Sequence, residues 1–321
     1  MRIYNKNNLM INTPKVSIIV PFYGEQSQVV IETLNSLLKC DYDNLKLIFV
    51  DNGCKTNIST EIKNKYKPVK LIKSEKNLGV CGGRNLGIKN LDGDEDFIIF
   101  FDSDQVADSQ MIKELIKPIL KENNIGITTP KIYFHPDFLD SKKEKKFQDD
   151  MNLIKGEKVI WSAGTDINLI TGQVLFFGGP ESLELNIEKE VSVAPGVICC
   201  SKEVLQELKG FDEIYESVYE DTDFCFRAKK LGFKTIYAPK AIAWHKIYFD
   251  PKGSEKKLLT RLFFIGRNRI IFMKRFSHNF YLFLLFLPVY TIYYFLISLR
   301  NFEIKPIIDF LKGSFEGILK K

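Results

Sequence analysis

Short, mostly apolar runs alternate with amphipathic stretches through the first third of the chain. The apolar runs, which predict strands, cover residues 16–20, 45–50, 69–72 and 97–101. They are apolar at odd and even positions alike, which is typical of parallel strands covered on both faces. Pro21 is expected to end the first strand, and helical spacing over residues 26–38 and 82–89 separates the runs. Strands that alternate with helices in short units predict a doubly wound α/β sheet.

The pattern changes after residue 125. Residues 131–158 are rich in charge and predict an irregular, exposed segment. The elements that we expect beyond it are strands of a mixed second region within residues 159–177 and 191–200, and helices over residues 201–208 and 221–231. Ser201 suits the N-cap of the first of these helices, and Gly232 closes the second.

A long apolar segment lies near the carboxyl end. Residues 280–299 are twenty residues without a charge, enough to cross about 30 Å of hydrocarbon. A buried core helix and a re-entrant or surface-lying hairpin are the alternatives. Residues 256–275 carry seven basic residues and no acid, and residues 300–321 are amphipathic. Both flanks therefore suit an anionic membrane surface.

Composition narrows the function only slightly. The chain of 321 residues is 45% hydrophobic and 27% charged, as is ordinary for a globular protein, and its net charge of +6 is too small to indicate nucleic acid. Its six cysteines show no zinc-type spacing, so we expect free thiols in a reducing compartment. The polar residues 1–14 predict no signal peptide, which favours a cytosolic catalytic portion.

The strongest candidate for chemistry is Asp102-Ser103-Asp104, directly after the apolar run 97–101. The carboxyl end of a strand is where open α/β sheets bind ligands, and two carboxylates there can reach a divalent cation on a diphosphate. Simple loop solvation is the alternative. Asp51 ends an earlier strand, and it either accepts hydrogen bonds from a nucleoside or caps its own turn.

Three further groups have both a functional and a structural interpretation. Arg84 lies among glycines at a helix start, which suits an anionic ligand but also a tight loop. His245 follows the strand-like residues 240–244, as a metal ligand or as a packed histidine. Glu220 and Asp221 open a helix, where acids are also ordinary partners of the helix dipole.

These motifs occur in a fixed order along residues 15–275. They are Val16-Ser17-Ile18-Ile19-Val20-Pro21-Phe22-Tyr23, Val50-Asp51-Asn52-Gly53, Asn77-Leu78-Gly79, Gly83-Arg84-Asn85-Leu86-Gly87, Asp102-Ser103-Asp104, Glu220-Asp221-Thr222-Asp223-Phe224-Cys225-Phe226-Arg227, His245 and Arg267-Asn268. Together they resemble family 2 glycosyltransferases of the GT-A fold, especially the subgroup similar to bacterial and archaeal rhamnosyltransferases.

The resemblance implies a role for each matching residue. Asp221 would be the general base, and Asp104 and His245 would bind Mg²⁺ or Mn²⁺. Residues bordering the acceptor and sugar would be Pro195, Gly196, Glu220 and Asp221. Residues binding the nucleotide sugar would be Pro21, Tyr23, Glu25, Asp51, Asn77, Gly83, Arg84, Asp102, Ser103 and Asp104.

The resemblance also implies a reaction. We expect an inverting, metal-dependent transfer of a hexose or deoxyhexose from a UDP-, dTDP- or GDP-sugar to a hydroxyl of a glycan or lipid-linked acceptor. Such a step serves the biosynthesis of cell-surface polysaccharide or glycolipid. The alternatives are a nucleotidyltransferase on the same fold, a glycoside hydrolase and a non-catalytic protein that binds nucleotide sugars.

The expected organisation follows from the motifs. It comprises an N-terminal extension (1–14), a nucleotide-binding half (15–125), an acceptor and catalytic half (126–255), a basic juxtamembrane segment (256–279), a transmembrane helix (280–299) and an amphipathic tail (300–321). Basic residues are more numerous before the helix than after it, which favours a single-pass membrane protein with a cytoplasmic catalytic domain.

Overall fold

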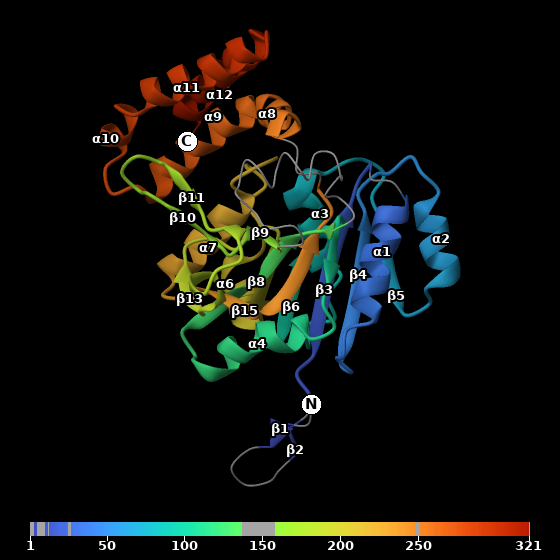
Figure 1. The fold of residues 1–321 in the computed structure, drawn as a ribbon. Helices are drawn as coiled ribbons and strands as arrows, with labels where there is room; N and C mark the ends of the chain where they lie inside the picture. Colours follow the sequence, from blue (N-terminus) through green and yellow to red (C-terminus); the bar gives the residue numbers. More distant parts are fainter. Residues whose placement is uncertain are drawn as a thin grey trace.

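The structure is a computed structural model that describes residues 3–4, 10–11, 13–24, 27–136, 158–247 and 251–320. An 11-stranded sheet forms its centre (Figure 1). The strands of this sheet are β3 (Val16–Phe22), β4 (Leu45–Asp51), β5 (Val69–Lys73), β6 (Phe97–Phe101), β7 (Gln105–Ala107), β8 (Ile125–Phe134), β9 (Val159–Ser162), β12 (Gly179–Pro180), β13 (Lys189–Val191), β14 (Val197–Ser201) and β15 (Lys234–His245). Two separate hairpins are β1 (Ile3–Tyr4) with β2 (Met10–Ile11), and β10 (Thr165–Ile167) with β11 (Val174–Phe176).

The sheet is parallel in its first half and mixed in its second. Strands β5, β4, β3 and β6 lie side by side and run parallel. Strand β14 then pairs antiparallel with both β6 and β8, and β15 pairs parallel with β8. The predicted doubly wound, mixed α/β sheet is therefore confirmed.

Helices cover both faces of the sheet. They are α1 (Ser27–Leu38), α2 (Ile58–Lys65), α3 (Gly79–Ile88), α4 (Met111–Lys121), α6 (Lys202–Leu208), α7 (Glu220–Lys230), α8 (Pro251–Leu259), α9 (Leu262–Phe276), α10 (Phe280–Leu284), α11 (Leu287–Arg300) and α12 (Lys305–Leu319), with a 3₁₀ turn, η2 (Glu184–Asn186). Ile18 packs with the apolar side chains of α1, α2 and α4, whereas Ile19 packs with those of α3, α6 and α7. Burial on both faces explains why these strands are apolar at every position.

Several boundaries differ from the predictions. Strand β3 continues through Pro21, because its pairing with β6 ends at Ile19 and the missing N–H of proline interrupts no ladder on that side. Strand β8 includes residues 131–134, which were expected to be irregular. Lys131 is buried there because its ammonium group bonds to Glu181, a partner that the local sequence does not reveal. Glu25 and residues 137–157 lie outside the described residues.

The predicted apolar segment forms α10 and α11. Within residues 280–300, a stretch of 18 residues has a mean hydropathy of 2.1, and 22% of this stretch is buried. The length and composition of the segment therefore fit a membrane span. After Asn301 the chain turns, and α12 packs against α9 at the top of the molecule (Figure 1). That the segment crosses a bilayer stays a prediction.

Candidate active site

Four predicted site residues meet at the carboxyl end of β6. Asp102 and Asp104 leave this strand with about a third of each side chain exposed, 33% and 34%. Asp221 comes from the start of α7 and His245 from the end of β15. These residues lie far apart in the sequence, and the sheet brings them to one edge, as expected for the ligand site of an α/β fold.

Arg84 joins the carboxylates of the two halves. It extends from α3, is almost completely buried, and donates from Nη2 to Asp102 Oδ1 at 3.0 Å and from Nη1 to Asp221 Oδ1. Its guanidinium lies 4.9 Å from the ring centroid of Phe211. Burial alone would lower the pKa of Arg84. The charges of Asp221 and Asp102 raise this pKa by more than burial lowers it, so the guanidinium stays charged. The predicted contact between Arg84 and a nucleotide stays a prediction.

Asp221 is held in place by the chain around it. Its Oδ2 accepts a hydrogen bond from the backbone N–H of Gly196 at 3.0 Å. Val218 and Tyr219, just before α7, have positive φ angles of 58° and 71°, which cost backbone energy for such residues. Asn268 stabilises this turn by donating to the carbonyl of Val218 at 2.9 Å. The Arg267-Asn268 motif, to which sequence reasoning gave no role, thus supports the loop that presents Asp221.

Asp104 and His245 form the second contact of the site. His245 Nε2 lies 3.2 Å from Asp104 Oδ2, and the backbone N–H of Lys246 donates to the carbonyl of Asp104 at 2.8 Å. Burial raises the pKa of Asp104, but the hydrogen bond and charge of His245 outweigh it, so the pKa is lowered. Two ligands of one octahedral ion, each about 2.1 Å from it, lie about 3 Å apart. Carboxylate oxygen and imidazole nitrogen at this separation fit a shared divalent cation.

The site carries an excess of negative charge. Burial, together with the charges of Asp104 and Asp221, raises the pKa of Asp102 to about 6, although Arg84 opposes the shift. Burial and then the charge of Asp221 raise the pKa of Glu220 to about 7. One buried guanidinium therefore faces several carboxyl groups, an arrangement that favours an additional cation.

Glu220 leads to a prediction about stability and pH. Because its pKa is higher in the folded state than in the unfolded chain, the folded state binds more protons between about pH 4.5 and pH 7, and the free energy of unfolding falls as pH rises through this range. Glu220→Gln removes this loss, so the variant should gain on the order of 1 kcal/mol relative to wild type between pH 5 and pH 8. Urea denaturation at both pH values measures it. Glu203→Gln, at an exposed first turn of α6, is the control, and an equal gain there would refute the assignment.

The carboxylate of Asp51 accepts hydrogen bonds from residues that follow it in the chain. The residue is fully buried, its Oδ1 accepts from the N–H of Cys54 at 2.7 Å, and its Oδ2 accepts from the hydroxyl of Ser59. These hydrogen bonds match the second interpretation of Asp51 from the sequence, in which its side chain caps its own turn. Its contact with a nucleotide stays a prediction.

The remaining predicted nucleotide residues surround the end of β3. Tyr23 is 49% exposed, and the side-chain oxygen of Asn77 accepts from the N–H of Gly79 at 2.8 Å. A Cβ atom at Gly83 would lie 3.1 Å from Cβ of Pro21, so close packing of α3 on β3 favours glycine there. Ser103 is buried, and its carbonyl accepts from Thr33.

Sequence reasoning missed two residues beside the site. The ring of Trp161 packs edge-on against His245, with centroids 4.5 Å apart, and lies next to Gly196. Gln105 is fully buried next to Gly196, and neither atom of its side-chain amide has a hydrogen-bond partner among the described residues. Neither residue belongs to a motif, so only the fold places them here.

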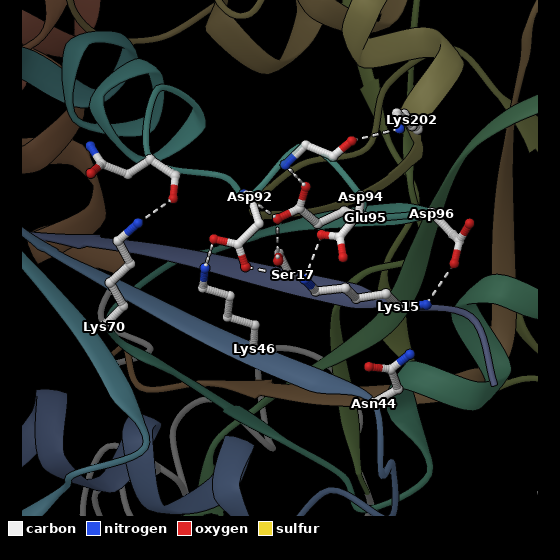
Figure 2. Close-up of polar contacts among 12 residues, drawn as sticks. Lys15, Ser17, Asn44, Lys46, Lys70, Asp92, Asp94, Glu95, Asp96 and Lys202 are labelled. Atoms are coloured by element: carbon white, nitrogen blue, oxygen red, sulfur yellow. Dashed lines mark hydrogen bonds and ion pairs between the residues drawn. The ribbon is translucent and has the colours of Figure 1, made fainter. Parts of the chain in front are cut away.

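A second acidic cluster lies at the opposite end of β6. Asp92, Asp94 and Glu95 precede this strand, and their carboxylate oxygens lie within 4.8 Å of one another. Figure 2 shows these acids among the basic and hydroxyl side chains that bind them. Lys15 Nζ lies 2.5 Å from Asp94 Oδ1 and 3.1 Å from Asp92 Oδ2. Lys46 pairs with Asp92 as well. The lysines balance the charge of this cluster, which is separate from Asp102 and Asp104.

Comparison with known families identifies the chain. The model of Glycosyl transferase family 2 matches residues 17–169, and that of Glycosyl transferase family group 2 matches residues 97–307. The chain is a family 2 glycosyltransferase. It is 35% identical over 117 residues to an uncharacterized glycosyltransferase of Rickettsia conorii, covering 36% of this chain and 18% of the relative. It is 28% identical over 112 residues to glycosyltransferase GlyG of Streptococcus pneumoniae, covering 34% and 36%. The matches span less than half of these relatives.

Solved structures confirm the fold of the glycosyltransferase. The mannosyltransferase PcManGT from Pyrobaculum calidifontis, solved with GDP-Man and Mn²⁺, has a TM-score of 0.56 at 13% identity and covers 95% of this chain and 74% of its own. GalNAc-T7, solved with UDP, GalNAc and Mn²⁺, has a TM-score of 0.57 at 16% identity, with coverage of 74% and 44%. The glycosyltransferase therefore has the predicted GT-A fold.

Proposed function

We propose that the glycosyltransferase inverts the anomeric centre as it moves a sugar from a nucleoside diphosphate to an acceptor hydroxyl. The observation that carries this proposal is the ion-paired bridge of Arg84 between Asp102 and Asp221. It couples the expected donor side of the site to the expected acceptor side. A nucleotidyltransferase needs no carboxylate at the position of Asp221.

Asp221 is the proposed general base. Because its Oδ1 is paired with Arg84, its Oδ2 takes the acceptor proton as the acceptor oxygen attacks the anomeric carbon. The bond from that carbon to the diphosphate breaks on the opposite side, and the leaving group departs with the electron pair. The N–H of Gly196 orients the carboxylate. Proton transfer occurs late, when the bonded alcohol has become acidic, so a carboxylate suffices as base.

Asp104 and His245 are the proposed metal ligands, with Asp102 next to them. When bound, Mg²⁺ or Mn²⁺ would offset the charge that develops on the leaving diphosphate. The 3.2 Å separation of the two ligand atoms supports this assignment. So does the presence of Mn²⁺ in the structures of PcManGT and GalNAc-T7.

The first half of the domain, residues 15–125, is proposed to bind a UDP-, dTDP- or GDP-sugar. The proposed nucleotide-sugar contacts are Pro21, Tyr23, Glu25, Asp51, Asn77, Gly83, Arg84, Asp102, Ser103 and Asp104. Residues 126–255 are proposed to receive a glycan or lipid-linked acceptor, next to Pro195, Gly196 and Glu220. We place the catalytic domain at the cytoplasmic face of the cell membrane, where nucleotide sugars are made.

Donor binding tests the proposal. Calorimetric titration of the full chain with UDP-, dTDP- and GDP-sugars, with and without Mn²⁺, should show one nucleotide bound more tightly, and at least about tenfold more tightly with the metal. The reason is that the metal offsets repulsion between the diphosphate and the carboxylates of the site. Binding of every donor with equal strength in excess chelator would contradict the proposed metal site.

A further inference from the structure

Helices α9 and α12 are packed with their backbones in contact. A Cβ atom at Gly266 would lie 2.6 Å from the carbonyl oxygen of Phe310, and one at Gly317 would lie 2.6 Å from that of Arg267. Gly313 faces the carbonyl of Phe263 in the same way. Glycines four residues apart allow such close approach of two helices. The helices on either side of the apolar segment are therefore packed directly against each other.

The chain turns back after the apolar segment. Helix α10 ends at Leu284, α11 runs over Leu287–Arg300, and Phe302 adopts a positive φ of 56° where the chain reverses toward α12. A single crossing would separate α12 from α9. We propose that the helical unit formed by residues 256–320 lies in one leaflet at the surface of an anionic membrane and does not span it.

Exposed apolar side chains are concentrated on α10, α11, α12 and the turn between α11 and α12, and we call them the docking face. Tyr281 is 81% exposed, Leu285 71% and Phe302 98%. The other exposed large side chains of this docking face are Leu282, Val289, Ile292, Tyr293, Phe295, Leu296, Leu299, Ile304, Ile308, Leu311, Phe315, Ile318 and Leu319. Most of the exposed large hydrophobic side chains of the described residues lie here. A surface of this size marks a membrane or protein contact, not an ordinary solvated surface.

The charges around the docking face select a membrane. Arg267 and Arg269 belong to the seven basic residues of the flank, but both are buried and cannot reach a membrane surface. The exposed basic side chains that remain are Lys256, Lys257, Arg261, Lys274, Arg300, Lys305, Lys312 and Lys320. Of the acids nearby, Glu255 is paired with Arg300, Asp309 with Lys305, and Glu316 with Arg267 and Lys320, whereas Glu303 is exposed, so basic side chains outnumber acids. An apolar face rimmed by lysines complements the anionic headgroups and acyl chains of a bilayer.

The docking face is connected through α9 to the loop that carries the base. From α9, Arg267 donates to the carbonyl of Ile214 at 2.9 Å, and Asn268 donates to that of Ser217 at 2.7 Å. Arg269 contacts the hydroxyl of Tyr219 at 3.2 Å. Docking in the membrane plane would hold Asp221 near the headgroups. A position of Asp221 near the headgroups suits a lipid-linked acceptor, and this one consequence rests on the proposed function.

Sedimentation with vesicles tests the docking face. The full chain should bind phosphatidylglycerol–phosphatidylcholine vesicles and bind pure phosphatidylcholine at least about tenfold more weakly. Leu285→Glu combined with Leu296→Glu should lower binding by about tenfold or more, because two carboxylates would enter the apolar region. Leu120→Glu on α4, where the side chain is 50% exposed, is the matched control. Unchanged vesicle binding by the double variant, with loss of self-association instead, would assign the face to a second copy and overturn the inference.

Labelling with a membrane-impermeant maleimide tests the topology. Lys256→Cys and Lys320→Cys lie at the two ends of the unit, and five of the six native cysteines are buried, so the background is low. In a bacterial host we expect both variants to gain label in inverted membrane vesicles and neither in intact cells. Labelling of Lys320→Cys alone from outside the cell would show a spanning helix and overturn the inference. Neither test depends on sugar transfer, so each can fail or succeed independently of the proposed function.

Discussion

Replacing Asp221 by asparagine should lower turnover by about 10²–10⁴-fold while donor binding changes little. Asparagine keeps the shape of the side chain and an oxygen for the hydrogen bond from Gly196, but it cannot accept the proton of the acceptor hydroxyl. It also removes a charge next to Arg84, so calorimetric titration with the donor must accompany the rate measurement. The expected pattern is a large loss in kcat with nearly unchanged donor affinity.

Two comparisons make the Asp221 result specific. Asp212→Asn removes a carboxylate that pairs with Arg275 outside the site, and it should leave turnover near wild type. If Asp221→Asn is active and Glu220→Gln is not, the base is Glu220, whose Oε2 has no hydrogen-bond partner among the described residues. Product stereochemistry gives an independent check, because a retained anomeric configuration would rule out a single displacement.

Replacing Asp104 by alanine should abolish metal-dependent transfer. The change removes one of the two proposed ligands, and His245 alone would hold a divalent cation weakly. Turnover measured against Mn²⁺ concentration should fall to background at every concentration, and excess chelator should do the same to wild type. Circular dichroism would confirm that the variant is folded.

The matched control for Asp104 is Asp94→Ala. Asp94 belongs to the other acidic cluster, where Lys15 balances its charge, so this variant should keep the metal dependence of wild type. Loss of metal dependence in Asp94→Ala but not in Asp104→Ala would place the ion at the wrong end of β6 for this mechanism. Full turnover of wild type in excess chelator would remove the metal from it altogether.

The sequence predicted the features of the fold that depend on local pattern. Strand β6 matches its predicted range, and Ser201 caps α6 by accepting from the N–H of Val204 at 3.3 Å. Helices α2 and α4 were not predicted, although α4 is strongly amphipathic with six buried residues. Pro118 within α4 disguised that pattern, because proline usually ends a helix.

The site was predictable in its members but not in its contacts. Asp102 and Asp104 were recognisable from their position after an apolar strand, and Asp221 from its motif. The bridge from Arg84 to Asp221 joins residues 137 positions apart on different helices, and no local signal encodes it. Likewise, hydropathy predicts the apolar segment before Arg300 and its length. The glycine contacts that pack α12 against α9 could not be predicted from it, because they form only in the folded chain.

The measurement that tests the central claim most directly is identification of the phosphate product. The full-length protein is incubated with Mn²⁺ and a panel of UDP-, dTDP- and GDP-sugars, and the released nucleotide is separated by chromatography. The account predicts that one donor class yields its nucleoside diphosphate and that Asp104→Ala yields none. Release of pyrophosphate or a nucleoside monophosphate, or no release from any donor by folded protein that binds one, would contradict it.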